Sequence, residues 1–165
     1  NSVDTAALSP ASKLLTIILM FIGGSPGSTA GGIKTTSVAV VLVFLFSGIR
    51  GRRGAYVFGR RIPDDAMRRT GMIVSTNLIL ALCGALVLCG TQSLPLSDVL
   101  IETFSAIGTV GMSTGITREL TNFSALIVAL LMYCGRVGSV SFAMALLERR
   151  SDPPVTYPTE QVTVG

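Results

Sequence analysis

The chain has 165 residues, of which 49% are hydrophobic and only 13% are charged, with a formal net charge of +4 and a mean hydropathy of +0.66. This composition is too apolar for an ordinary soluble domain of this length, so we expect a membrane protein. Histidine is absent and the nine acidic residues lie outside the long apolar runs, so acid–base and metal-dependent hydrolysis lack suitable side chains and an enzyme is not expected.

From residue 11 to residue 49 the chain is apolar, but a helix of that length would extend for roughly 58 Å, nearly twice the ~30 Å hydrocarbon core of a bilayer. Residues 23–36 interrupt this run with five glycines and one proline. Within residues 1–49 we therefore expect one membrane helix that is broken by an intramembrane loop. Non-helical backbone at membrane depth is tolerated only where protein or a water-filled cavity surrounds it, so this loop is expected to line a pathway. Lys34 in the loop is a functional candidate, because ionisable residues inside a membrane are costly.

A basic loop is expected from residue 50 to residue 69. It contains seven of the thirteen Lys and Arg residues, namely Arg50, Arg52, Arg53, Arg60, Arg61, Arg68 and Arg69. The positive-inside rule places such a loop in the cytoplasm, and this explains the net charge better than nucleic-acid binding does. Residues 70–90 then form a clean apolar span that runs from the inside to the outside.

A short helix is expected from Ser97 to Ile107. It would extend for roughly 16 Å, about half of the hydrocarbon core, so it enters the membrane and stops there, with the negative end of its dipole favouring a cation. The following segment, residues 108–115, contains Thr-Val-Gly at 109–111, which is similar to the start of the Thr-Val-Gly-Tyr-Gly loops that line potassium channels with backbone carbonyls. The alternative is a Gly-rich surface loop between two helices.

We interpret this segment as an ion selectivity filter formed by Gly108, Thr109, Val110, Gly111 and Met112. Potassium would be bound by the main-chain carbonyls of Thr109, Val110 and Gly111. The glycines permit backbone angles and a close approach that other residues resist, so the chemistry of the predicted site lies in the main chain.

Residues 123–147 form the last expected span, with Asn122 as the helix N-cap and a course from outside to inside. Arg136 is near the middle of this span, where insertion scales assign a charged residue a cost of roughly 2.5–3.5 kcal/mol, so it must have hydrogen-bond partners. The candidate partners are the free carbonyls of the loop at residues 23–32 or an acid outside this chain. The tail, residues 148–165, begins with Glu-Arg-Arg, is rich in Pro and is expected to lie in the cytoplasm.

A resemblance to a known family rests on four stretches: Phe-Ile-Gly-Gly-Ser-Pro-Gly-Ser-Thr-Ala-Gly-Gly-Ile-Lys-Thr-Thr at 21–36, Ser-Ala-Ile-Gly-Thr-Val-Gly-Met-Ser-Thr-Gly at 105–115, Gly-Arg-Val-Gly at 135–138 and Tyr-Pro-Thr-Glu at 157–160. They are similar to the Trk/Ktr/HKT superfamily of potassium transporters, and most similar to the membrane subunit of the bacterial Ktr type. That family folds as four span–pore-loop–span repeats around one pore, so the resemblance implies an all-α membrane protein.

In such a fold, residues 1–49 would be the rear part of the third repeat and residues 70–147 the complete fourth repeat. The chain begins in mid-motif without an initiator Met, as a fragment would. By this likeness Gly111 is the filter glycine of the fourth repeat. The gate would consist of Arg136 together with the intramembrane loop, that is Gly23, Gly24, Ser25, Pro26, Gly27, Ser28, Thr29, Ala30, Gly31, Gly32 and Lys34.

The resemblance implies potassium uptake across the bacterial cytoplasmic membrane by the pore-forming subunit of a gated, channel-like transporter. Potassium is then the transported ion, no cofactor is bound covalently, and nucleotide is expected only on a partner, a cytosolic nucleotide-binding regulatory ring. The full subunit is expected to form a homodimer and to contact membrane lipid but no nucleic acid. Preference for potassium over sodium depends on four filter positions, of which this chain contains one.

Two alternatives compete with this interpretation. One is a secondary transporter with a substrate site at the broken helix, and the other is a non-conducting membrane scaffold. A carrier is expected to show a second broken helix in inverted symmetry and a coupling carboxylate in a span, and the sequence shows neither. A scaffold requires neither a half-length helix that ends in Thr-Val-Gly nor a basic residue in mid-membrane.

Overall fold

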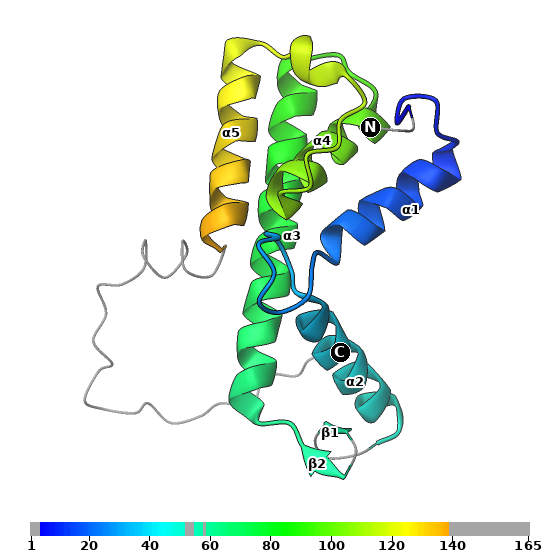
Figure 1. Cartoon of the computed structure of the whole chain (residues 1–165), viewed down its shortest axis with the longest axis vertical. Helices are drawn as coiled ribbons and strands as arrows, with labels where there is room; N and C mark the ends of the chain where they lie inside the picture. Colours follow the sequence, from blue (N-terminus) through cyan, green and yellow to red (C-terminus); the bar gives the residue numbers. More distant parts are fainter. Residues whose placement is uncertain (1–3, 52–54, 58, 139–165) are drawn as a thin grey trace, which may run out of the picture.

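The computed structural model describes residues 4–51, 55–57 and 59–138, and this part of the chain is mostly helical, as expected (Figure 1). In chain order its elements are α1 (Pro10–Phe21), α2 (Thr35–Ile49), β1 (Tyr56–Val57), β2 (Arg60–Arg61), α3 (Asp64–Thr91), α4 (Leu96–Gly108), the 3₁₀ turn η1 (Ile116–Arg118) and α5 (Asn122–Val137). The later part of the expected last span and the whole expected tail, residues 139–165, lie outside the described residues.

The long helix α3 is the axis of the structure (Figure 1). Helices α4 and α5 pack against its C-terminal half, α1 packs against α4, and α2 packs against its N-terminal half. Among the described helices, α3 alone is long and apolar enough to cross a membrane by length and composition, while α1, α2 and α5 are apolar but shorter. The predicted span at residues 70–90 lies within α3.

The expected loop of residues 50–69 is shorter than predicted, because α3 already begins at Asp64. Pro63 is the N-cap residue, and its φ of −61° leads directly into a helix, while Asp64 and Asp65 lie at the positive end of the helix dipole. Part of the remaining loop forms the antiparallel pair β1 and β2, which the sequence analysis did not predict. The loop is joined to α3 by an exposed ion pair of 2.9 Å between Arg61 and Asp64.

In the described part of the predicted last span, residues 123–147, α5 ends at Val137, while residues 139–147 lie outside the described residues. Gly138 follows with φ 93°, which a continuing α-helix does not allow. The N-cap is also one residue earlier than predicted, since the Thr121 hydroxyl accepts the Ser124 N–H at 3.3 Å. Arg136 lies in the last turn of α5.

The predicted break in the first apolar run is confirmed. α1 ends at Phe21 and α2 begins at Thr35, one residue before the predicted end of the loop at residue 36. We call the connecting residues 23–34 the glycine loop. Its two ends are joined by a hydrogen bond of 3.1 Å from the Thr35 N–H to the Gly24 carbonyl, so the loop closes on itself between the two helices.

α4 is the most deeply buried element of the described chain, because α1, α3 and α5 all pack against it. It is one residue longer at each end than the predicted helix, and every residue from Ile101 to Gly108 is buried. The Phe21 and Phe104 rings meet edge to face with centroids 5.5 Å apart. The outer faces of α1, α2 and α5 instead expose large apolar side chains, for example Ile49, which is 81% exposed, as expected of surfaces that meet lipid or other protein.

Candidate functional site

The C-terminal end of α4 turns into the predicted filter through an unusual backbone conformation. Thr109 adopts φ 51° and ψ 40°, and it is the one non-glycine residue with positive φ in the described part of the chain. This left-handed conformation costs a non-glycine residue roughly 1–2 kcal/mol. Hydrogen bonds from the Thr109 N–H to Ala106 (3.1 Å) and from the Val110 N–H to Ser105 (3.0 Å) hold the turn in place.

The carbonyls of Thr109, Val110 and Gly111 accept no hydrogen bond from any described residue. Val110 and Gly111 are exposed and Thr109 is half-buried, so these three carbonyls are open to water or to an ion. Gly111 has φ 82°, and a Cβ added there would meet nothing within 4 Å, so glycine is needed at this position for its backbone angle and not for space.

The glycine loop lies directly against this turn. The Gly31 N–H donates a hydrogen bond of 2.7 Å to the Thr109 hydroxyl. A Cβ on Gly31 would lie 2.7 Å from the Gly135 carbonyl oxygen and from two atoms of the Thr109 side chain, and a Cβ on Gly32 would lie 3.2 Å from the Gly108 Cα. The glycine loop therefore approaches the start of the predicted filter so closely that a side chain at Gly31 or Gly32 would not fit without movement.

Both cations of the predicted gate bind carbonyls of the glycine loop. Arg136 Nη1 donates to the Thr29 carbonyl, which agrees with the expectation that loop carbonyls are its partners. Lys34 Nζ donates to the Ala30 carbonyl at 2.5 Å and to the Ser28 carbonyl at 3.2 Å. Hydrogen bonds to charged groups contribute about 1.5–3 kcal/mol each, so these two side chains hold the loop in one arrangement.

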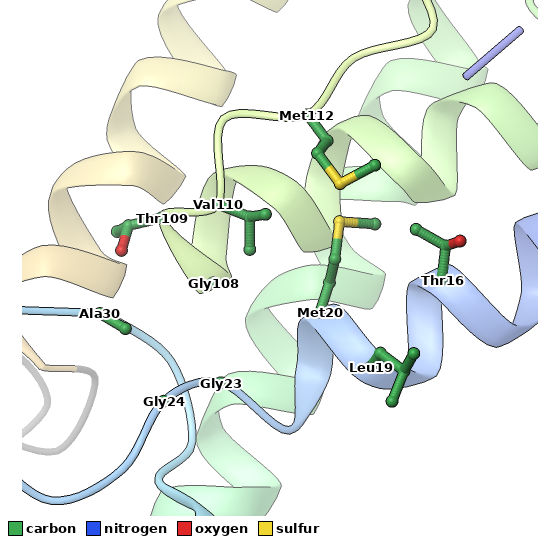
Figure 2. A pocket seen from close by; sticks show the side chains of 10 residues that line it. All are labelled: Thr16, Leu19, Met20, Gly23, Gly24, Ala30, Gly108, Thr109, Val110 and Met112. Atoms are coloured by element: carbon green, nitrogen blue, oxygen red, sulfur yellow. The ribbon is translucent and has the colours of Figure 1, made fainter. Parts of the chain in front are cut away.

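A pocket of about 530 Å³ separates part of the glycine loop from the predicted filter (Figure 2). It is lined by Thr16, Leu19, Met20, Gly23, Gly24, Ala30, Gly108, Thr109, Val110 and Met112. Figure 2 shows the Met20 and Met112 side chains pointing toward each other, with Val110 beside them. None of the lining residues is ionisable, so polar contacts for an ion in this pocket would come mainly from the main chain.

A second pocket, of about 460 Å³, lies on the Arg136 side of the glycine loop, between the loop and the end of α5. The glycine loop lines both pockets, and Ala30 is the residue that the two linings share. Of the predicted gate residues, Ser25, Pro26 and Gly27 line neither of these pockets and are exposed at the loop tip. Gly111 does not line them either.

Two charged contacts of α4 were missed by the sequence analysis. Glu102 is only 4% exposed within α4, so an acid outside the long apolar runs is nevertheless buried. Asp98, one turn earlier, forms an ion pair of 2.8 Å with Lys13 of α1. The sequence contained a signal for these contacts, because an acidic residue in a short helix that enters the membrane requires a hydrogen-bond or charge partner.

Comparison with known proteins gives a family match over nearly the whole chain. The family model for TrkH, described as a cation transport protein, matches residues 1–152. The chain belongs to the TrkH family. The resemblance drawn from the motifs is thereby confirmed, and membership of this family of cation transport proteins agrees with a membrane location and not with an enzyme.

Several curated relatives of this TrkH-family chain have transport names. The potassium/sodium uptake protein NtpJ of Enterococcus hirae is 36% identical over 99% of this chain, which covers 38% of that relative. The Ktr system potassium uptake proteins B and D of Bacillus subtilis are 32% and 36% identical over 100% and 99% of this chain, which covers 37% and 36% of them. The chain thus spans less than two-fifths of the length of these relatives.

Proposed function

We propose that this chain is the C-terminal part of a longer TrkH-family subunit, called the full subunit below, and that it contributes one wall and the gate of a potassium-conducting pore. One observation carries the proposal: the glycine loop is hydrogen-bonded, through the Gly31 N–H, to the first residue of a carbonyl-bearing turn at the end of a buried short helix. A pore needs a coordinating wall and an obstruction beside it, and these two segments supply both.

The proposed wall consists of the carbonyls of Thr109, Val110 and Gly111, which accept no hydrogen bond from the described residues and would replace part of the hydration shell of the ion. The 13 residues of α4 extend for roughly 20 Å, less than the ~30 Å of a hydrocarbon core, so the helix ends inside the membrane. Its carbonyl end adds a partial negative charge at that point. By the family resemblance, the other walls come from repeats outside this chain.

The proposed gate is the glycine loop with Lys34 and Arg136. The loop is anchored by Ile33, which is 1% exposed, and by hydrogen bonds to its carbonyls and from Gly31. Its residues 25–29 are exposed, so a second arrangement of this part is accessible at moderate cost. In the described arrangement it lies against the filter and narrows the path beside it.

The filter assignment is tested by Gly111→Ser in the full subunit. We expect the ratio of potassium to sodium flux to fall about tenfold, because a serine resists φ 82° and the carbonyls on either side would turn away from the ion. Fluxes are measured in proteoliposomes with each cation in turn. Gly48→Ala is the control, since Gly48 lies in α2 with open space around it. Unchanged discrimination in the Gly111 variant would contradict the assignment.

The gate assignment is tested by Arg136→Gln. We expect maximal potassium flux to rise about tenfold at normal membrane insertion, because loss of a charged hydrogen bond of ~1.5 kcal/mol releases the loop by that factor. Arg136→Lys separates charge from geometry, since it keeps the charge and loses the guanidinium. A fixed charge ~8 Å from a passing cation raises its energy by ~2 kcal/mol at an effective dielectric of ~20, so near wild-type flux in the lysine variant identifies the charge as the main barrier. Unchanged flux in the glutamine variant would indicate a purely structural arginine.

A secondary transporter with its substrate in the 530 Å³ pocket at the broken helix is the second candidate. The size of the pocket favours it, but its apolar lining offers no charged group for a substrate or for coupling. A pore is expected to conduct potassium in the absence of any organic solute. Of the added solutes, only a large excess of sodium is expected to compete with that flux.

The orientation and the partners follow from the resemblance and stay predictions. We propose that residues 50–63 and the tail 148–165 face the cytoplasm, that a cytosolic nucleotide-binding ring regulates the subunit there, and that the full subunit is a homodimer. The described part of that loop carries exposed Arg60 and Arg61, as the positive-inside rule requires.

A further inference from the structure

A buried carboxylate lies behind the proposed filter. Glu102 belongs to α4 and is 4% exposed. Its Oε1 atom accepts a hydrogen bond of 2.5 Å from the Thr117 hydroxyl, whereas its buried Oε2 atom has no partner among the described residues. Thr117 itself is exposed, in the turn η1 that follows the filter segment. A buried charge that is bound by only one exposed hydroxyl is costly, so packing alone does not explain it.

The Thr117 hydroxyl connects Glu102 to the outer limb of the filter segment, which we define as residues 113–117. The Thr117 and Ser113 hydroxyls are 2.8 Å apart, and the Ser113 hydroxyl accepts the Gly115 N–H at 3.0 Å. On its other side, the Ser113 carbonyl accepts a hydrogen bond of 2.5 Å from the Thr5 hydroxyl, and Thr5 is buried. The outer limb is therefore held from two directions, by α4 and by the segment that precedes α1.

The carboxylate determines the direction of this chain of hydrogen bonds. Thr117 has one hydroxyl hydrogen and donates it to Glu102, so the hydrogen between Thr117 and Ser113 must come from Ser113. Ser113 then accepts from the Gly115 N–H. Every donor points toward Glu102, and hydrogen bonds aligned in one direction polarise and strengthen one another.

We infer that Glu102 is a positioning residue of the pore: through Thr117 and Ser113 it sets the backbone of the outer limb, and with it the carbonyls that strip water from an entering potassium ion. The inference rests on the proposed filter function and adds a determinant of ion discrimination that lies outside the filter residues themselves. Its acceptor is negatively charged, so a neutral acceptor of the same shape is expected to hold the limb less firmly.

The test is Thr117→Val in the full subunit, with Thr117→Ser as the matched control. Valine has the shape of threonine without its hydroxyl. Thr117 is exposed, so the substitution removes no core packing and the variant is expected to fold. In proteoliposomes we expect the valine variant to lower the potassium-to-sodium flux ratio about fivefold and to raise the potassium concentration at half-maximal flux, with the maximal flux nearly unchanged. The serine variant, which keeps the hydroxyl, is expected to behave like the wild type. Glu102→Gln is expected to show the same change as valine to a smaller extent.

The outcomes distinguish this inference from the function on which it rests. Loss of discrimination in Gly111→Ser together with wild-type discrimination in Thr117→Val would leave the filter standing and overturn the role of Glu102. Equal effects of valine and serine would also overturn it, because the hydroxyl would then not be responsible. A merely structural role predicts less inserted protein and a lower maximal flux at an unchanged flux ratio, and that result counts against the inference. Absence of selective cation flux in the wild-type full subunit would reject the proposed function and this inference together.

Discussion

Alanine in place of Gly135 is expected to destabilise the full subunit by about 3 kcal/mol, at the upper end of the usual cost of overpacking. A Cβ at this position would overlap the Ile107 carbonyl oxygen and lie 3.1 Å from the Ile107 Cα. Both neighbours are backbone, so neither can move aside without displacing α4 or α5 as a whole. Chemical denaturation of the purified protein in detergent measures the effect.

Gly84→Ala is the matched control, because Gly84 also lies in a helix at a contact with α5. Its added Cβ would meet the Leu131 Cδ1 at 2.5 Å, which is the end of a flexible side chain that can rotate away. Alanine also favours a helix by about 1 kcal/mol over glycine, so the net change is expected to stay below ~1 kcal/mol. Equal destabilisation by the two substitutions would show that the backbone contact at Gly135 has no special importance.

Alanine in place of Gly31 is expected to raise potassium flux about thirtyfold in the absence of any activating partner. The added methyl group would need the space of the Thr109 side chain and the Gly135 carbonyl, so the glycine loop must move away from the filter. That movement breaks the Gly31 hydrogen bond to Thr109 and weakens the Arg136 contact to Thr29. A combined loss of ~2 kcal/mol shifts an equilibrium by a factor of about thirty. Rubidium influx into vesicles measures the change.

Gly27→Ala provides the comparison for this flux experiment. Gly27 lies in the same loop with φ 83°, and a Cβ there would contact nothing within 4 Å. The substitution strains the loop tip without displacing the part that faces the filter, so basal flux is expected to stay near that of the wild type. If both variants leak equally, the loop responds to any perturbation and its contact with Thr109 is not what closes the pore.

The break in the first helix and the extent of α4 were predictable from simple arithmetic. A 39-residue apolar run is too long for one crossing, and the cluster of glycines with Pro26 marks the interruption. The predicted short helix agrees with α4 to within one residue at each end, since a Pro precedes it and the Gly-rich segment follows it. These features depend on local composition, which a sequence displays directly.

The ends of α3 and α5 were predicted less well for a physical reason. Residues 64–69 were assigned to the basic loop, although a proline before a first turn with two aspartates favours the start of a helix. Gly138 ends α5 inside an apolar run, and hydropathy contains no information about the φ angle of one glycine. The sequence left two candidate partners for Arg136, the loop carbonyls or an acid outside this chain, because the contact with Thr29 depends on how two distant segments pack.

The burial of Glu102 in α4 shows a different limit of prediction from sequence. The sequence analysis placed Glu102 outside the long apolar runs and predicted no burial for it. The structure buries it, and its partner Thr117 lies beyond the filter segment. Glu102 and Thr117 lie on either side of the filter segment and meet because the chain turns back there. The spacing of residues in the sequence does not reveal such a contact.

The central burial of α4 also constrains how the protein is made. Two of its packing partners, α1 and α3, leave the ribosome before it, but the third, α5 with Gly135, leaves after it. A half-length helix that carries a buried carboxylate has no stable place in lipid by itself. We therefore expect the nascent α4 to stay beside the translocation machinery until α5 is synthesised, so that the two helices enter the membrane as a pair.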